Sequence, residues 1–168
     1  VEGGKINVDF DGESNDVRQD ENDASFGTFT ILATAEDLDV NQMDFVLHKN
    51  ANTYTLEDMK IRDKNGHGTY SLTSPSTIGL AQTSSTVRVE DLTLEKGVAY
   101  EFEILGDINN TATSGSSYNF TWAAASVDAT GVSSDNDVSA NDFSSAALSG
   151  PSIAVDISSL TARTSALS

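Results

Sequence analysis

The sequence predicts an all-β protein built as an antiparallel sandwich. Hydrophobic and polar residues alternate in short segments along most of the chain, which is the pattern of strands with one buried face. Turn-forming Gly, Asn and Asp residues separate these segments, and no long stretch shows the 3.6-residue period of a helix. About eight to ten such segments within 168 residues are typical of a β-sandwich.

The first third of the chain contains three expected strands. They are Lys5–Phe10, Phe26–Ala35 and Val40–Lys49, and in each the apolar residues occupy alternate positions. Between the first two lies Asp11–Asp23, which is acidic and rich in turn formers. We therefore expect a loop there, next to the edge of the first strand.

The middle of the chain predicts an irregular strand and a hairpin. In Tyr54–Arg62 the apolar residues have mixed spacing, which indicates a bulge or a short helical turn. The residues Asp63-Lys64-Asn65-Gly66 follow, and Asn-Gly readily adopts the positive φ angles of a tight hairpin. A returning strand is expected at His67–Leu72.

Three further strands are expected at Thr86–Leu94, Val98–Leu105 and Tyr118–Ala124. The first changes phase at Leu92, and the turn Glu95-Lys96-Gly97 after it predicts a second hairpin. The strand Tyr118–Ala124 has Tyr, Phe and Trp on one face. Such an aromatic stripe is most often sandwich core, and the alternative is a platform that stacks on sugar rings.

The last part of the chain predicts a detached strand. Asp128–Gly150 is rich in Ser, Asp, Asn and Ala, with little periodicity, and then Ile153, Val155 and Ile157 alternate. We expect a sandwich domain at 1–150 and an extended arm at 151–168. Because such a long connection is unusual within one domain, the strand either closes its own sandwich or completes the sheet of a neighbouring copy.

Charge and composition exclude several classes of function. The chain has 26 acidic and 9 basic residues, a net charge of −17, so it repels nucleic acids and anionic membranes. It has no cysteine, and no apolar run is long enough to span a membrane. No nucleophile motif, phosphate loop or metal-binding histidine pair occurs. We therefore expect a protein that is not an enzyme and has no nucleic-acid partner.

Two groups of acidic residues are candidate calcium ligands, because calcium prefers six to eight oxygen ligands. The first group lies around the glycine turn after the first strand and comprises Asp9, Asp11, Glu13, Asn15, Asp16 and Asp20. The second comprises Asp135, Asp137 and Asp142. Neither has the closing Glu of an EF-hand, so the alternative is a solvated acidic loop.

Two asparagines lie in N-glycosylation sequons. Asn109 begins Asn-Asn-Thr in an expected loop, and Asn119 begins Asn-Phe-Thr inside an expected strand. The side chain of Asn119 is expected on the face opposite the aromatic stripe, where a glycan could reach it.

The order of these segments is similar to that of a known family. "FGTFTILATAEDLDVNQMDFVLHKN", "TLEDMKIRDKNG", "VRVEDLTLEKGVAYEFEILGDI" and "FTWAAASVDATGVSS" together resemble one unit of the Ig-like repeats of prokaryotic cell-surface, S-layer-like and filament proteins. The resemblance covers about Lys5–Ile157. It implies an Ig-like sandwich, or a jelly-roll-like variant, with a cell-surface or filament role and no catalytic residue.

These observations predict a structural subunit of an extracellular filament or surface layer. Its partner would be a second copy, joined head to tail by exchange of the strand at Ile153, Val155 and Ile157, with calcium as a candidate cofactor. The sequence stops shortly after Ile157, where a tandem repeat would continue, and this favours a separate subunit. The alternative is an adhesin or carbohydrate-binding module of a larger surface protein, with surface glycans as partners.

Overall fold

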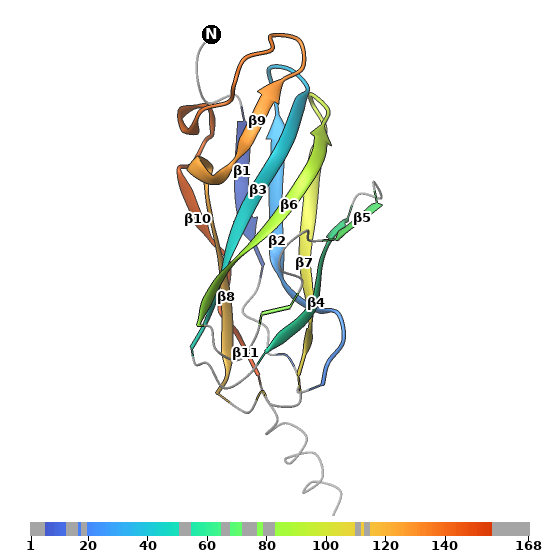
Figure 1. The fold of residues 1–168 in the computed structure, drawn as a ribbon, viewed down its shortest axis with the longest axis vertical. Helices are drawn as coiled ribbons and strands as arrows, with labels where there is room; N and C mark the ends of the chain where they lie inside the picture. Colours follow the sequence, from blue (N-terminus) through green and yellow to red (C-terminus); the bar gives the residue numbers. More distant parts are fainter. Residues whose placement is uncertain are drawn as a thin grey trace, which may run out of the picture.

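The computed structural model is a sandwich of two antiparallel sheets, which confirms the predicted all-β fold (Figure 1). It describes residues 6–12, 17, 20–50, 55–64, 68–71, 77–78, 83–109, 112 and 115–155, with backbone alone at 68–71. This part of the chain forms strands β1 to β11 and two short 3₁₀ turns, η1 (Ala124–Ser126) and η2 (Ala140–Asp142). Within it, no helix is long and apolar enough to cross a bilayer.

The first sheet has five strands in the order β1-β2-β7-β4-β5. Their bounds are β1 Ile6–Asp11, β2 Ala24–Ala33, β7 Ala99–Ile108, β4 Leu56–Asp63 and β5 Gly68–Ser71. The second sheet has the order β10-β8-β3-β6, with β11 also paired to β8 and β9 to β3. Their bounds are β10 Ala147–Ser149, β8 Ser117–Ala123, β3 Leu38–Lys49, β6 Ser84–Leu94, β11 Ile153–Ala154 and β9 Asp128–Gly131.

Aromatic rings join the two sheets at the centre of the core. Phe29 of β2 is fully buried, and its ring centroid lies 5.3 Å from that of Phe45 and 5.1 Å from that of Trp122, both in the second sheet. Tyr118 and Phe120 of β8 are buried beside Trp122. The aromatic stripe of β8 is therefore core, as the more frequent of the two interpretations predicted, and it offers no platform to a sugar.

Bulges account for the irregular spacing in three strands. The predicted bulge of β4 is confirmed, since its pairing with β7 shifts between Glu57 and Lys60, and Asp58 has a φ of 50°. The alternation of buried and exposed side chains also changes phase in β3 and in β6, at positions that lie opposite each other in the sheet. The pairs Val40↔Leu92 and Gln42↔Glu90 flank this point without a change of register, because each strand accommodates the same extra residue.

The turn Glu95-Lys96-Gly97 does not form the predicted hairpin. It carries the chain from β6 in the second sheet to β7 in the first, beside the connection that crosses from β2 to β3. The Gly97 N–H donates to the carbonyl of Ala33 at 2.8 Å, and the Lys96 N–H donates to Asp37 Oδ1 at 2.7 Å. A tight turn reverses the direction of the chain, but it does not determine which strand the next strand pairs with. That partner depends on which of the two sheets has an unpaired edge to offer.

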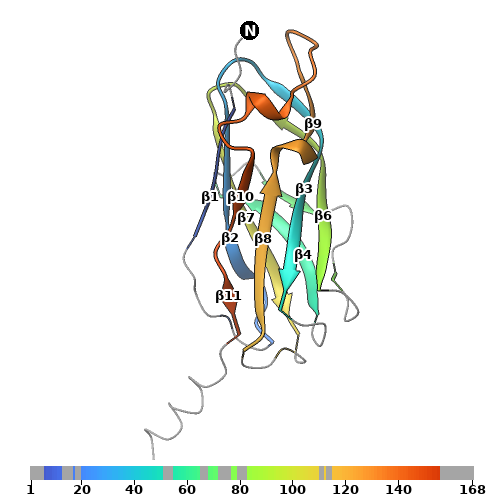
Figure 2. The same cartoon turned by 90° about the vertical axis from the view of Figure 1, so that its left-hand side faces the viewer.

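The segment after β9 closes one side of the sandwich. The aperiodic part Asp128–Gly150 was not predicted to contribute, whereas closure by the strand at Ile153 was one of the two predicted alternatives. In Figure 2, β10 lies alongside β1, the edge strand of the opposite sheet, and β11 lies farther down, beyond the end of β1. The N–H of Ser144 donates to the Ile6 carbonyl at 2.8 Å, and the Ser144 hydroxyl accepts from the Val8 N–H at 2.9 Å. Phe143 is buried against Trp122, with 5.4 Å between ring centroids.

Replacing Phe29 with Ala tests whether the aromatic contact holds the sheets together. Removing a buried phenyl ring at the junction of the two sheets should lower the free energy of unfolding by about 3–5 kcal/mol. Urea denaturation followed by tryptophan fluorescence measures the change. The neighbouring substitution Thr30→Ala, on the outer face, serves as the control. Equal losses in the two variants would contradict a special role for Phe29.

Candidate functional site

The C-terminal strand is the strongest candidate for a functional element. In the structure, β11 pairs with β8 of its own chain through Ile153↔Tyr118 and Ala154↔Ser117. On its other side, the Val17 N–H donates to the Ala154 carbonyl at 2.8 Å. The strand therefore lies between two neighbours of the same chain and is bonded to both.

The side chains of this strand belong to the core. Ile153 and Val155 are only 1% and 2% exposed, and the Val155 N–H donates to the Ser116 carbonyl at 2.8 Å. The arm predicted from residue 151 thus begins within the sandwich. Ile157 and the rest of the arm lie outside the described residues. Exchange of the strand between copies remains a prediction.

The first candidate calcium group is spread along an edge. Asp9 and Asp11 have exposed side chains on β1, and Asp20 is exposed, with a φ of 61°. Glu13, Asn15 and Asp16 lie outside the described residues. In the part of the chain that the structure describes, no three His, Cys, Asp or Glu side chains converge as metal ligands. Calcium at this loop stays a prediction.

A lysine is the counter-ion of the carboxylates that follow this loop. The ammonium of Lys60 lies 2.8 Å from Asp23 Oδ1, and the Asp23 N–H donates to Asp107 Oδ1 at 2.9 Å. The pKa of Lys60 is raised, first by the hydrogen bond to Asp23 and then by the charges of Asp23, Asp58 and Asp107. A side chain of the protein thus occupies the position where these carboxylates would attract a cation.

The second candidate calcium group lies at a pocket of about 580 Å³ at one end of the sandwich. Asp137 and Asp142 line it, together with Glu36, which the sequence analysis did not single out, and Asp135 is not among the lining residues. Apolar residues also contribute to its wall. They are Ile6, Ala33, Ala35, Leu38 and Val138.

The Glu36 carboxylate holds the loop after β9. Its Oε1 accepts hydrogen bonds from the N–H groups of Ser133 and Ser134, both at 2.9 Å, and its Oε2 accepts from the Ser134 hydroxyl at 2.7 Å. These bonds, led by that of the Ser134 side chain, lower the pKa of Glu36. Gly131 packs so closely on the carboxylate that a Cβ would collide with it.

Asp142 also has a structural task at this pocket. Its Oδ2 accepts from the Ser139 N–H at 2.8 Å, and the Ser139 side chain caps η2 in return. Two of the three pocket carboxylates, Glu36 and Asp142, therefore stabilise loops. These hydrogen bonds account for the positions of Glu36 and Asp142 in the fold, and calcium at Asp135, Asp137 and Asp142 stays a prediction.

Lys49 is a buried cation at the end of β3. Its side chain is 5% exposed, and loss of hydration lowers the pKa of its ammonium group. Its N–H donates to the Thr83 carbonyl at 2.8 Å, which ties the end of β3 to the start of β6.

Both sequon asparagines use their side-chain nitrogen within the fold. Asn109 Nδ2 donates to the carboxylate of Glu57, and Asn119 Nδ2 donates to the Gly150 carbonyl at 2.8 Å. Because a glycan would be attached to that nitrogen, modification would disturb these contacts. Asn119 is half-buried beside the chain that links β10 to β11, rather than open on the sheet face. Glycosylation at both positions stays a prediction.

The sequence matches no protein-family model and no curated protein. Several solved structures are similar in fold at low identity. CaCohA2 from Clostridium acetobutylicum is 16% identical, with a TM-score of 0.40 over 91% of this chain and 92% of that one. BslA, a bacterial hydrophobin, is 14% identical, with a TM-score of 0.35 over 92% and 94%. AvmM, which catalyses macrocyclization in alchivemycin A biosynthesis, is 7% identical, with a TM-score of 0.43 over 91% and 89%.

The hydrogen bonds of Glu36 predict a pH-dependent contribution to stability. A carboxyl group whose pKa is lower in the folded state stabilises it above the ordinary pKa of Glu, and this stabilisation disappears as the pH falls through the lowered value. Wild-type protein should therefore have a higher Tm than Glu36→Gln at pH 7. The difference should shrink below about pH 4. A Tm difference that stays constant with pH would contradict the prediction.

Proposed function

We propose that this chain is a structural subunit of an extracellular assembly in which copies join through the C-terminal strand. The observation that supports the proposal most is the position of Ile153 and Val155. Both are core side chains of the C-terminal segment, in which Ile153 begins β11 and Val155 follows it, and the main chain there is bonded on both sides. The same main-chain bonds form whether such a strand comes from its own chain or from another. Exchange would therefore preserve the contacts seen in the single chain.

The direction of the chain is compatible with a head-to-tail arrangement. The start of β1 and the end of β11 lie toward opposite ends of the sandwich in both views (Figures 1 and 2). A contact between copies through the C-terminal strand would therefore lie at the end of the sandwich opposite the pocket. Heterologous contacts of this kind generate filaments when they do not close into rings.

Net charge sets a condition on the assembly. Copies that each carry −17 repel one another, so close approach requires screening by salt or cations between carboxylates. Calcium is the proposed bridging ion, because exposed carboxylates such as Asp9 and Asp11 on β1 are oxygen ligands of the type it prefers.

The alternative, an adhesin or carbohydrate-binding module, has less support. The aromatic residues that the sequence offered for sugar stacking, Tyr118, Phe120 and Trp122, are buried in the core. A glycan site would have to use other residues. Binding to a glycan array by a protein that stays monomeric would favour this alternative.

A pair of engineered cysteines tests strand exchange directly, since the chain has no cysteine of its own. Ser117 and Ala154 are directly opposite on β8 and β11. Opposite residues in antiparallel strands have Cα atoms about 4.5–5.5 Å apart, within the range of a disulfide. In assembled Ser117→Cys/Ala154→Cys protein, exchange should join chains covalently, giving a ladder on a non-reducing denaturing gel.

A matched pair on strands that are not exchanged provides the control. His48 and Ser84 are opposite on β3 and β6 of one chain, so His48→Cys/Ser84→Cys should give only monomers. If the Ser117→Cys/Ala154→Cys protein assembles but runs as monomer, copies do not exchange this strand, and the proposal is wrong.

Calcium should promote assembly by neutralising carboxylates between copies. Sedimentation velocity in calcium chloride should show larger species than in sodium chloride of equal ionic strength, and a chelator should reverse the change. Isothermal titration calorimetry should show heat of binding. Equal sedimentation in the two salts would mean that screening suffices and that no calcium site exists.

A further inference from the structure

The pocket at one end of the sandwich combines an apolar wall with carboxylates, and it is called the end pocket below. Ile6, Ala33 and Leu38 in its wall are buried side chains of the core, and Val138 is half-buried and packs against that core. The volume of about 580 Å³ lies within the roughly 300–1,000 Å³ of pockets that bind ligands. Such a pocket suits a group that has an apolar stem and a positive charge.

Asp137 is the carboxylate of the end pocket that is available to a partner. The other two carboxylates accept hydrogen bonds that hold loops, as described above. The Asp137 side chain is exposed, and within the described part of the chain no hydrogen bond or ion pair reaches its carboxylate. The main chain on both sides of it is fixed. The Val138 N–H donates to the Ala129 carbonyl at 2.9 Å. The Gly131 N–H donates to the Asn136 carbonyl, also at 2.9 Å.

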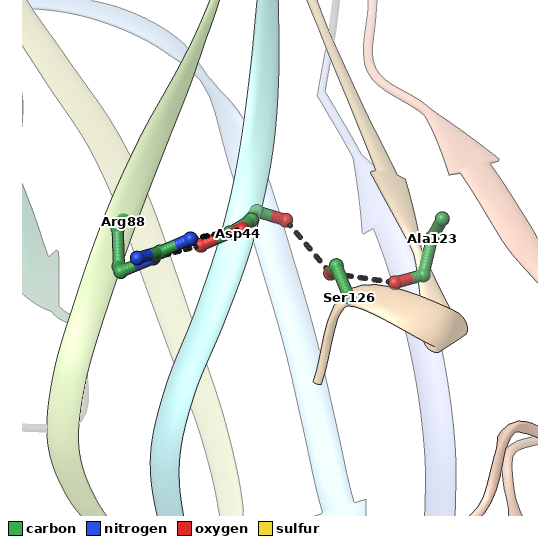
Figure 3. A network of polar contacts seen from close by, with 4 residues as sticks. All are labelled: Asp44, Arg88, Ala123 and Ser126. Carbon is green, nitrogen blue, oxygen red and sulfur yellow. Dashed lines mark hydrogen bonds and ion pairs between the residues drawn. The ribbon is translucent and has the colours of Figure 1, made fainter. Parts of the chain in front are cut away.

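Basic side chains elsewhere in the structure already have partners in their own chain. Arg88 Nε donates to Asp44 Oδ1 at 2.8 Å, and Arg88 Nη2 donates to Asp44 Oδ2 at 3.0 Å (Figure 3). Lys60 and Arg62 also form ion pairs with carboxylates. No described Lys or Arg forms an ion pair with a carboxylate of the end pocket. A cation for this pocket would therefore come from the rest of the chain or from another copy.

The C-terminal arm has the composition that suits the end pocket. After Val155 the only charged side chains are Asp156 and Arg163, and Leu160 and Leu167 lie in the same segment. An arginine packs its methylene stem on apolar surface and binds a carboxylate through two N–H groups. In a chain with a net charge of −17, the segment from residue 157 onward can approach acidic residues without like-charge repulsion.

The end pocket lies far from the point where the arm begins. Leu38, which lines the pocket, begins β3, and Lys49 ends it. Lys49 and Ile153 are both opposite Tyr118, so Ile153 is one length of β3 away from the pocket. The 12 residues of β3 span roughly 36 Å. Val155 lies still farther from the pocket, because β11 runs away from it.

The arm is too short to bring Arg163 to the pocket of its own chain. Fully extended, the chain from Val155 to Arg163 spans at most about 29 Å. In both views β9, which leads into the loop that carries Asp137, lies toward the end of the sandwich opposite to β11 (Figures 1 and 2). When a second copy is placed end to end with the first, its pocket therefore lies next to the arm of the first.

We propose that the C-terminal arm of one copy docks in the end pocket of the next, with the Arg163 guanidinium on the Asp137 carboxylate. The leucines of the arm supply apolar contact to the wall of the pocket. The inference deepens the proposed head-to-tail assembly by naming a second contact, but it does not require exchange of β11. Whichever copy β11 completes, the arm leaves that copy at the end opposite its pocket. An exposed ion pair contributes about 1 kcal/mol or less, so the contact is reversible.

Charge reversal tests the pairing of Arg163 with Asp137. Asp137→Lys or Arg163→Asp should weaken self-association about tenfold or more in sedimentation equilibrium, because like charges then meet. The double variant Asp137→Lys/Arg163→Asp should associate again, since the opposite charges have only changed places. Circular dichroism and the Tm verify that each variant is folded. A folded double variant that does not associate would overturn the proposal.

Two matched controls locate the contact. Asp128 is exposed and does not line the end pocket, so Asp128→Lys changes the net charge as Asp137→Lys does but should not weaken association. Lys5 precedes Ile6 of the pocket wall and is the competing cation. Lys5→Ala and Arg163→Ala each remove one positive charge, and only Arg163→Ala should weaken association. Equal effects within either pair of variants would mean that the proposal is wrong.

A synthetic peptide of residues 156–168 tests the occupant of the pocket. Arg163→Asp protein is the receptor, because its own arm does not compete. The labelled peptide should bind this protein in fluorescence anisotropy, and the peptide with Arg163→Ala should bind about fivefold more weakly. The Asp137→Lys/Arg163→Asp protein should not bind the wild-type peptide. If the Arg163→Asp protein does not bind it either, the pocket takes another ligand and the proposal fails.

The disulfide-locked protein separates this inference from the proposed function. The monomeric fraction of oxidised Ser117→Cys/Ala154→Cys protein cannot exchange β11, but its arm remains free and should still join copies. If this protein stays monomeric at millimolar concentration in about 0.15 M salt, the inference is wrong, and a ladder from assembled protein would still support strand exchange. Association of the locked protein without any ladder would support the inference and overturn strand exchange.

Discussion

The packing of Phe29 edge to face against Phe45, and at a tilt of 42° against Trp122, is the interaction on which the rest of the structure depends. The three rings come from both sheets and fix how the sheets face each other. Trp122 extends the contact to Phe143, which lies outside the regular strands. Among the described side chains, the indole N–H of Trp122 is the one buried polar atom without a hydrogen-bond partner. Packing of the ring evidently outweighs that loss, which is typically about 1–3 kcal/mol.

Phe143 connects this core to the closure of the sandwich. With Phe143 held against Trp122, Ser144 reaches the backbone of β1, and the chain then continues along β8 as β10 and β11. The C-terminal strand therefore occupies its position because an aromatic contact some ten residues earlier sets its direction. The sandwich is thus held together by contacts that do not involve the C-terminal strand. That strand makes few contacts of its own, so it is the element most suited to exchange.

The sequence was sufficient to predict elements with many alternating residues, such as β2, β3 and β7. It could not predict β10, since a strand of three residues has no period to detect, whereas the alternation of Ile153, Val155 and Ile157 did predict a strand where β11 lies. The turn at Gly97 was read as a hairpin because local chemistry does not reveal which sheet the next strand joins. Glu36 was missed for a related reason. Its partners Ser133 and Ser134 are about a hundred residues away, and no local pattern connects them.

The distribution of charge limits what the proposed contacts can build. Strand exchange is directional and can extend without end, because such a contact does not close on itself. Lateral contacts between copies bring like charges together on both sheets. The first sheet presents Asp9, Asp11, Glu101 and Glu103, and the second presents Asp39 and Glu90. Growth in two dimensions would need cations between these carboxylates. Strand exchange and the charge of both faces together therefore favour filaments over an extended surface layer.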